Sequence, residues 1–174
     1  QSSIKKKLGF NIDHRKVPPA EYGISEMMVD LYLNYDKPMS HQQLFNWHEM
    51  ITTGRRDLMD VGRYRTHKDP MQVVSGRSDK PIVHFEAPPS NSIEKEMEQF
   101  IFWFNKVHNR NERLRILPLA NAGIAHLYFV CIHPFEDGNG LIGRAIAEKS
   151  LALSIQQPTL LSLSHTIESK KKQY

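Results

Sequence analysis

The fold is decided by a helix and the loop after it: ANAGIAHLYFVCI at residues 120–132, then HPFEDGNGLIGR at residues 133–144. The first half is apolar nearly all round, which predicts a helix buried at the centre of a bundle. Pro134 ends that helix, and Gly138 and Gly140 permit backbone conformations that other residues resist. We therefore expect a sharp turn that leads into a new helix at residues 141–153.

Most of the remaining chain carries helical periodicity. Apolar residues at i, i+3 and i+4 spacing predict helices at 24–32 and 93–107. A third helix begins after Ser40 and stops at Gly54, with its inner face made by Leu44, Trp47, His48 and Ile51. Terminal helices are expected at 4–8 and 160–172, and the Pro18-Pro19 pair predicts a loop over residues 10–19. The fold class is mostly α, a helical bundle at residues 23–174 preceded by a remnant helix and linker at 1–22. Cys131 is assigned to the core, as are Trp47 and Trp103.

Two short runs of β-favouring residues, at 72–75 and 82–85, flank a polar tip and predict a β-hairpin. A lone two-stranded hairpin on a helical protein cannot be a core element. Its exposed edge is either covered by a neighbouring segment or available to pair with an extended peptide, and the sequence leaves both readings open.

Length and composition exclude several classes of protein. The chain has 174 residues, 40% hydrophobic and 24% charged, which excludes low-complexity and disordered chains. One cysteine excludes an internal disulfide framework and a Cys-based zinc site, and favours a reducing compartment, here the cytoplasm. No stretch approaches the roughly 20 apolar residues that span a bilayer. The net charge of +4 is spread along the chain, which argues against a nucleic-acid partner. Four residues are read as exposed arginines or as part of a substrate surface: Arg55, Arg56, Arg63 and Arg65.

The loop at residues 133–144 has the residue types that phosphate chemistry needs. Glycines, free amides and the positive end of the next helix make an anion-binding cradle. Asp137 is a hard carboxylate that can hold Mg²⁺, and Arg144 can grip phosphate oxygens bidentately. His133 titrates near neutrality and can take a proton from a hydroxyl. Each residue alone also has a plainer structural reading, because Asp-Gly-Asn-Gly is a common turn sequence.

Together these residues resemble the signature of the Fic family, His-x-Phe-x-(Asp/Glu)-Gly-Asn-Gly-Arg-x-x-Arg, at every specified position but one. The resemblance covers most of the chain from about Gly23 and includes a hairpin where the family carries its flap. It implies a Fic-type helical bundle and a protein adenylyltransferase. Such an enzyme uses ATP and Mg²⁺ to move AMP onto a Ser, Thr or Tyr hydroxyl of a target protein.

The resemblance also implies a role for each matching residue. His133 would deprotonate the target hydroxyl, Asp137 would hold the Mg²⁺, and Arg144 would hold the terminal phosphates. Asn139 would orient the α-phosphate, and the Phe135 ring would turn inward as an anchor. The loop residues that would bind the nucleotide are Phe135, Gly138, Asn139 and Gly140. The flap would align the target by strand addition through Val73, Val74, Ser75, Gly76, Arg77, Ile82, Val83 and His84.

Leu141 departs from the family pattern, because it stands where the family has its first Arg. Loss of that guanidinium would slow transfer by roughly 10²–10³. Two alternatives therefore stay open: a nucleotide-binding or interaction module with little turnover, and transfer or removal of another phosphate-linked group. The chain does not begin with Met, and the resemblance implies an inhibitory helix upstream whose Glu would pair with Arg144. Ser164 and Glu168 match the spacing of the inhibitory motif, but a solvent-facing helix is the plainer reading.

Overall fold

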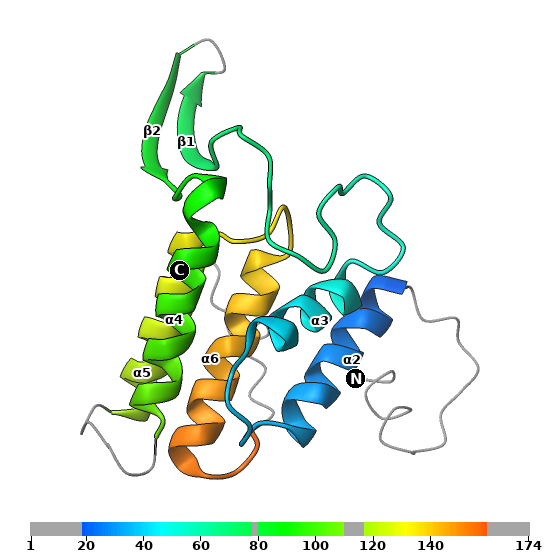
Figure 1. Cartoon of the computed structure of the whole chain (residues 1–174), viewed down its shortest axis with the longest axis vertical. Coiled ribbons are helices and arrows are strands. Elements are labelled where there is room, and N and C mark those ends of the chain that lie inside the picture. Colours follow the sequence, from blue (N-terminus) through cyan, green and yellow to red (C-terminus); the bar gives the residue numbers. More distant parts are fainter. Residues whose placement is uncertain (1–18, 78–79, 110–116, 160–174) are drawn as a thin grey trace.

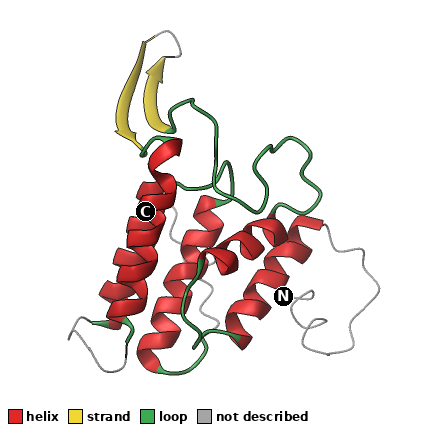
Figure 2. Ribbon diagram, viewed as in Figure 1, coloured by secondary structure: helices red, strands yellow, loops and turns green. Residues whose placement is uncertain are grey.

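A computed structural model describes residues 19–77, 80–109 and 117–159 (Figure 1). In chain order the elements are α2 (Pro19–Leu33), α3 (His41–Ile51), β1 (Gln72–Arg77), β2 (Lys80–Glu86), the single turn η1 (Ser90–Ser92), α4 (Ile93–Val107), α5 (Pro118–Ile132) and α6 (Asn139–Ile155). The helices lie side by side, and the hairpin projects from one end of them (Figure 2). A mostly helical fold with one hairpin is confirmed. The helices expected at 4–8 and 160–172, with Ser164 and Glu168, lie outside the described residues.

Helix α2 begins at Pro19, so the expected loop is wrong at its last residue. Proline is tolerated at the first position of a helix, because the N–H that it lacks has no intrahelical partner there. The division expected between residues 22 and 23 stays a prediction, and it falls within this helix. Met27 and Leu31 are buried, and Trp47 donates to Asp30 Oδ2 at 2.7 Å, which joins α2 to α3.

Helices α3 and α4 follow the sequence pattern closely. The Ser40 hydroxyl accepts from the Gln43 amide at 3.2 Å and caps α3, and Gly54 follows its end with φ of 87°. The four residues predicted to line the inner face of α3 are its buried residues. Helix α4 has the predicted bounds, and its apolar stripe meets the core through Phe100 and Phe104.

The helix buried at the centre of the bundle is α6, so the central position predicted for α5 is wrong. Helix α5 buries one face, whereas Leu119 and Leu127 on the other face are 74% and 63% exposed in the described structure. In α6 the residues from 145 to 152 are all buried. The small residues of α6 contribute to this, because they let neighbours approach closely: a Cβ at Gly143 would lie 2.9 Å from Val130 Cγ2.

The predicted core is largely confirmed. Trp47 is fully buried and Trp103 packs against the main cluster of buried side chains. Cys131 is the exception, since its side chain is only half-buried at the C-terminal end of α5. No helix in the described ranges is both long and apolar enough to cross a membrane.

The hairpin is antiparallel, with Val74 opposite Val83 and an irregularity between Val73 and Val74. A bulge of this kind leaves a residue unpaired and increases the local twist. Its apolar side chains are exposed, Val73 by 58% and Ile82 by 59%. Within the described chain neither strand pairs with a third, so the hairpin keeps two open edges.

Candidate phosphate-binding site

The loop between α5 and α6 turns through two residues with left-handed backbone. His133 caps α5 with φ of 52°, and Gly138 precedes α6 with φ of 80°. A side chain at 138 would be doubly unfavourable, because its Cβ would also lie 2.5 Å from Ile51 Cδ1. The Gly138 carbonyl accepts from the amides of Leu141 and Ile142, which starts α6. The amides of Asn139 and Gly140 therefore stand at the positive end of the helix dipole.

Asn139 holds the loop closed with its side chain. Its Oδ1 accepts from the Phe135 amide at 3.0 Å, and its Nδ2 donates to the Phe135 carbonyl at 2.8 Å. Both residues are buried. These two bonds occupy the side-chain amide of Asn139. Asn139 would therefore orient an α-phosphate indirectly, because its bonds set the shape of the loop.

Phe135 is the anchor of the loop, and its ring lies wholly inside the core. It stacks on His48 with ring centroids 4.3 Å apart, meets Phe45 edge to face and packs at a tilt against Phe129. The fully buried ring cannot touch a nucleotide, which corrects its place among the nucleotide-contacting residues. The inward anchor expected from the sequence is what the structure has.

His133 is half-buried, and its ring is oriented by the helix that it caps. Nδ1 lies 3.3 Å from the Val130 carbonyl, so a proton on Nδ1 leaves the lone pair on Nε2. Burial lowers the pKa of His133 below its ordinary value, and Asp137 opposes that shift. The imidazole is therefore neutral at pH 7 and able to accept a proton, and the carboxylate of Asp137 is near enough to act on it.

Asp137 is held by two donors. Arg55 Nη1 donates to its Oδ2 at 2.8 Å, and the Gly138 amide donates to its Oδ1 at 2.6 Å. These bonds, with that of Arg55 first, lower the pKa of Asp137, so it is ionised at neutral pH. The same guanidinium binds both oxygens of Asp57, and it holds the pKa of Asp57 at about 2.

The site fits Mg²⁺ only with help from a ligand. Mg²⁺ is commonly held by one or two carboxylates together with substrate phosphates and waters. The half-exposed carboxylate of Asp137 suits that mode, although Arg55 must first give up its bond to it. Among the described residues no three His, Cys, Asp or Glu side chains gather as a metal site.

Arg144 stands over the glycine turn on the first turns of α6. A Cβ on Gly140 would lie 3.5 Å from its Nη1, so the guanidinium lies within van der Waals distance of the glycine turn. Arg144 Nε is buried and has no hydrogen-bond partner among the residues that the structure describes. The residue as a whole is half-buried, so its guanidinium could still meet an anion in the loop through charge-assisted hydrogen bonds. Leu141 is half-buried against the core and offers no charge here.

The candidate site had contributors that the sequence analysis missed. The sequence predicts for Arg55 an exposed arginine or part of a substrate surface, and no local pattern indicates its contact with Asp137, 82 positions away. For Arg65 the prediction of a surface position, whether as an exposed arginine or in a substrate surface, is wrong, because only 2% of it is exposed. His48 was placed on the inner face of α3, but not beneath the loop, where its Nδ1 accepts from the Gly62 amide. A histidine within an otherwise apolar helical stripe was the available signal for that role.

Arg65 joins the hairpin to the loop. Its Nε donates to the His133 carbonyl at 2.8 Å, and its two terminal nitrogens donate to the Pro88 carbonyl and to Ser90 Oγ. The Arg65 amide also donates to the carbonyl of Pro134. The base of the hairpin is therefore fixed relative to His133.

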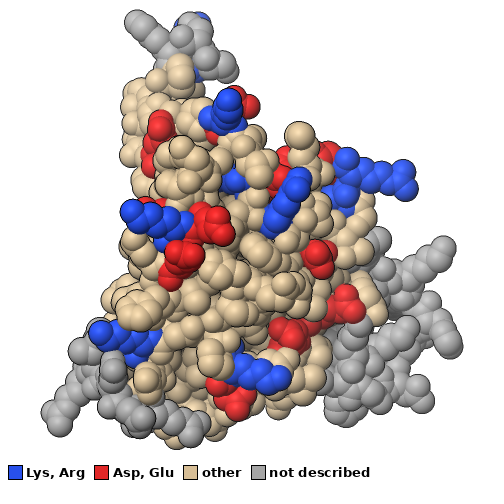
Figure 3. All heavy atoms as spheres, viewed as in Figure 1, with Lys and Arg blue, Asp and Glu red and all other residues tan. Residues whose placement is uncertain are grey.

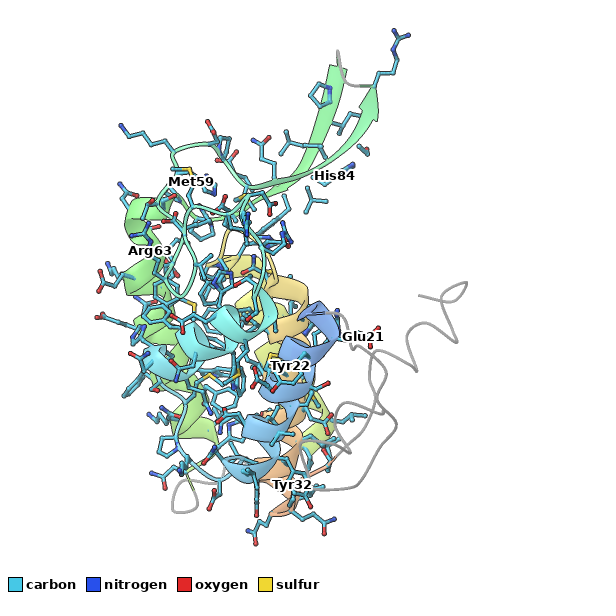
Figure 4. The ribbon with its side chains drawn as sticks, turned by 90° about the vertical axis from the view of Figure 1, so that its right-hand side faces the viewer. Glu21, Tyr22, Tyr32, Met59, Arg63 and His84 are labelled. Atoms are coloured by element: carbon cyan, nitrogen blue, oxygen red, sulfur yellow. The ribbon has the colours of Figure 1, made fainter. Side chains whose placement is uncertain are left out.

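The predicted flap residues lie apart from the loop, on the projecting hairpin. They are exposed on both strands, and Ser75 Oγ lies 2.6 Å from His84 Nε2 across the pair. In Figure 4, Met59 and Arg63 lie on the segment after α3, toward the same end of the molecule as His84. Figure 3 shows Lys and Arg interspersed with Asp and Glu on the face in view.

A model of the Fic/DOC family matches residues 38–151, well over half of the chain. The chain is 24% identical over 156 residues to protein adenylyltransferase fic-1 of Caenorhabditis elegans, covering 90% of this chain and 28% of that protein. It is 28% identical over 108 residues to protein adenylyltransferase Fic of Drosophila virilis, covering 61% and 21%. The chain thus spans about a quarter of the length of these relatives.

Solved structures show the same fold. Fic-1 from C. elegans superposes with a TM-score of 0.61 at 21% identity, covering 92% of this chain and 44% of that chain. A Fic family protein from Desulfovibrio desulfuricans G20 has a TM-score of 0.53 at 26% identity, covering 87% and 42%. A Fic domain containing signaling protein from Bacteroides thetaiotaomicron gives 0.63 at 19% identity, covering 87% and 56%.

Proposed function

The chain belongs to the Fic/DOC family, and from that premise we propose that it is a protein adenylyltransferase. It would transfer AMP from ATP to a Ser, Thr or Tyr hydroxyl of a target protein and release pyrophosphate. The observation that carries the proposal is the unpartnered buried Arg144 Nε beside the glycine turn, on a loop that also bears His133 and Asp137.

His133 would act as the base. Its pKa is lowered by burial, and its lone pair lies on Nε2 when Nδ1 carries the proton. Nε2 would take the proton of the target hydroxyl as that oxygen forms a bond to the α-phosphorus. The bond from the α-phosphorus to the bridging oxygen would break, and pyrophosphate would leave with the electron pair. In-line displacement of this kind depends on positioning and charge neutralisation.

The phosphates would be held by the loop and by Arg144. The amides of Asn139 and Gly140 would donate to phosphate oxygens at the positive end of α6. Arg144 would bind the terminal phosphates bidentately. Asp137 would hold Mg²⁺, which supplies charge neutralisation on the phosphate oxygens when bound. Asn139 and Phe135 would support this cradle from inside, because their contacts set its shape.

The hairpin would serve as the target-docking flap. Strand addition needs an open edge, and β1 and β2 both have one in the described structure. The docking residues would be those of the exposed strands: Val73, Val74, Ser75, Gly76, Arg77, Ile82, Val83 and His84. We further propose, as parts of this assignment, a cytoplasmic location and an inhibitory helix upstream whose Glu pairs with Arg144.

Leu141 favours a second candidate, a nucleotide-binding or interaction module with little turnover. It is half-buried against the core and supplies no donor to a phosphate. The same loop would also serve transfer or removal of another phosphate-linked group, since the cradle recognises phosphate oxygens rather than one leaving group.

Intact-mass measurement after incubation with ATP and Mg²⁺ tests the proposal. We expect a mass increase of one AMP on the protein or on a hydroxyl-bearing target, and its loss in His133→Ala. His67→Ala, a histidine on the segment before the hairpin, is the matched control and should keep the adduct.

Calorimetry with ATP separates the two candidates. Nucleotide binding should survive in His133→Ala and weaken in Arg144→Ala. Binding without any adduct in the unaltered protein supports the low-turnover module. Absence of nucleotide binding contradicts the adenylyltransferase and leaves only the interaction module of the second candidate.

A further inference from the structure

A pocket of about 450 Å³ lies at the base of the hairpin, outside the phosphate loop. Its walls come from the end of β2, the turn that follows, α4 and the last turns of α5. The residues that matter for its chemistry are Phe85, Glu86, Pro88, Glu96, Tyr128 and Cys131.

The pocket is fixed close to His133. Cys131 and Ile132 line it and directly precede the histidine in the chain. Arg65 adds a second link, because one guanidinium binds the His133 carbonyl and the carbonyl of the lining residue Pro88. A group bound in this pocket would therefore have a fixed position relative to the His133 imidazole.

The lining combines an apolar floor with two carboxylates. Phe85, Tyr128 and Pro88 supply the apolar surface, and Glu86 and Glu96 supply negative charge. Glu86 Oε2 accepts from Gln72 Nε2 at 2.6 Å, which holds this carboxylate at the base of the hairpin. Burial, and then the charge of Glu96, raise the pKa of Tyr128, so Glu96 acts inside this pocket. Apolar walls with acidic ends complement a side chain that has an apolar stem and a cationic head.

We propose that this pocket binds a lysine or arginine side chain of the acceptor protein, in the extended segment that pairs with the hairpin. Side chains of an added strand alternate in direction, so one near the acceptor hydroxyl can point down to the hairpin base. The charge complementarity of Glu86 and Glu96 selects a basic residue there. The proposal rests on the proposed function for its biological role, although its chemistry can be tested without turnover.

Cys131 allows that test, because it is the only cysteine in the chain and lines the pocket. We would compare its rates of reaction with a cationic and an anionic methanethiosulfonate, each relative to a free model thiol. A unit charge about 7 Å away changes each rate about threefold in water. The cationic reagent should therefore be favoured, and Glu96→Gln should remove much of the preference. Glu98→Gln, on the exposed face of α4, is the matched control and should leave it unchanged.

Peptides test the occupant directly. The probe is an extended peptide with an acceptor threonine and arginines at alternate flanking positions, compared with the same peptide carrying the neutral isostere citrulline. The arginine peptide should slow mixed-disulfide formation at Cys131 several-fold and the citrulline peptide should not, and Glu96→Gln should abolish the difference. Equal protection by both peptides, or by neither, overturns the proposal.

The two hypotheses fail in different ways. If the arginine and citrulline peptides receive AMP equally well and the cysteine rates show no charge preference, the pocket proposal is wrong and transferase activity stands. If no AMP is transferred but the cysteine rates and protection follow charge, the pocket is basic-selective and the proposed function is wrong.

Discussion

Asn139 offers a sharp test of how the loop between α5 and α6 keeps its shape. Its side chain makes two hydrogen bonds, to the amide and to the carbonyl of Phe135, and both residues are buried. Asn139→Ala removes both partners at once and leaves two backbone groups of Phe135 unsatisfied. A buried group left without its partner costs about 1–3 kcal/mol. We expect the free energy of unfolding to fall by about 2–4 kcal/mol, because water entering the vacated space recovers part of the loss.

Thermal and urea unfolding followed by circular dichroism would measure this loss. For a chain of this length the melting temperature should fall by about 5–12 °C. Asn46→Ala is the matched control, since Asn46 is exposed and its side chain accepts one bond, from Gln42, within the described residues. Its effect should stay within about 0.5 kcal/mol.

Hydrogen exchange at one amide would locate the cause. The Phe135 N–H should exchange faster in Asn139→Ala, because its acceptor is gone, while amides in the middle of α4 change only with global stability. If Asn139→Ala has the same free energy of unfolding as Asn46→Ala and the Phe135 amide keeps its protection, the side chain of Asn139 does not hold the loop in shape.

Three further predictions concern the same site. Arg55→Gln should raise the affinity for Mn²⁺ used as a probe of the Mg²⁺ site, measured by electron paramagnetic resonance, because Asp137 loses a competing cation; a lower affinity would mean that Arg55 supports metal binding. Leu141→Arg should increase AMP transfer from labelled ATP by up to about 10²-fold, since it restores a donor to the developing charge, and an unchanged rate would clear Leu141 as the limiting defect. Burial lowers the pKa values of His48 and His133 in the folded protein, so the unfolded chain takes up these protons first as the pH falls. The stability that they contribute should be complete above pH about 6.5 and decline below it, and a melting temperature constant from pH 7.5 to 5.5 would contradict this.

Several features of the molecule could be predicted because their causes are local. The bounds of α4 and the inner face of α3 follow from residues a few positions apart, whose spacing places them on one side of a helix. The hairpin follows likewise from two β-favouring runs around a polar tip. The position of the phosphate loop between two helices also came from local signals, a proline and a pair of glycines.

Errors arose where burial depends on partners distant in the chain. The apolar stretch of α5 has the composition of a central helix. In the structure the other elements pack around α6 instead, where small residues allow close contact. The hydrophobicity of a helix indicates how much apolar surface it could bury. How much it does bury depends on how closely the other elements pack around that helix in the folded protein.

The sequence by itself determined the catalytic candidates, since His133, Asp137 and Arg144 lie within twelve consecutive residues and need only a turn to meet. Tertiary structure alone decided what surrounds them. Arg55 reaches Asp137 across 82 positions, and Arg65 reaches His133 across 68. No periodicity encodes such contacts, because they arise only after packing brings the segment between α3 and the hairpin over the loop. The contacts that position His133 and Asp137 therefore form only in the folded protein, whereas the candidate side chains themselves can be identified from consecutive residues of the chain.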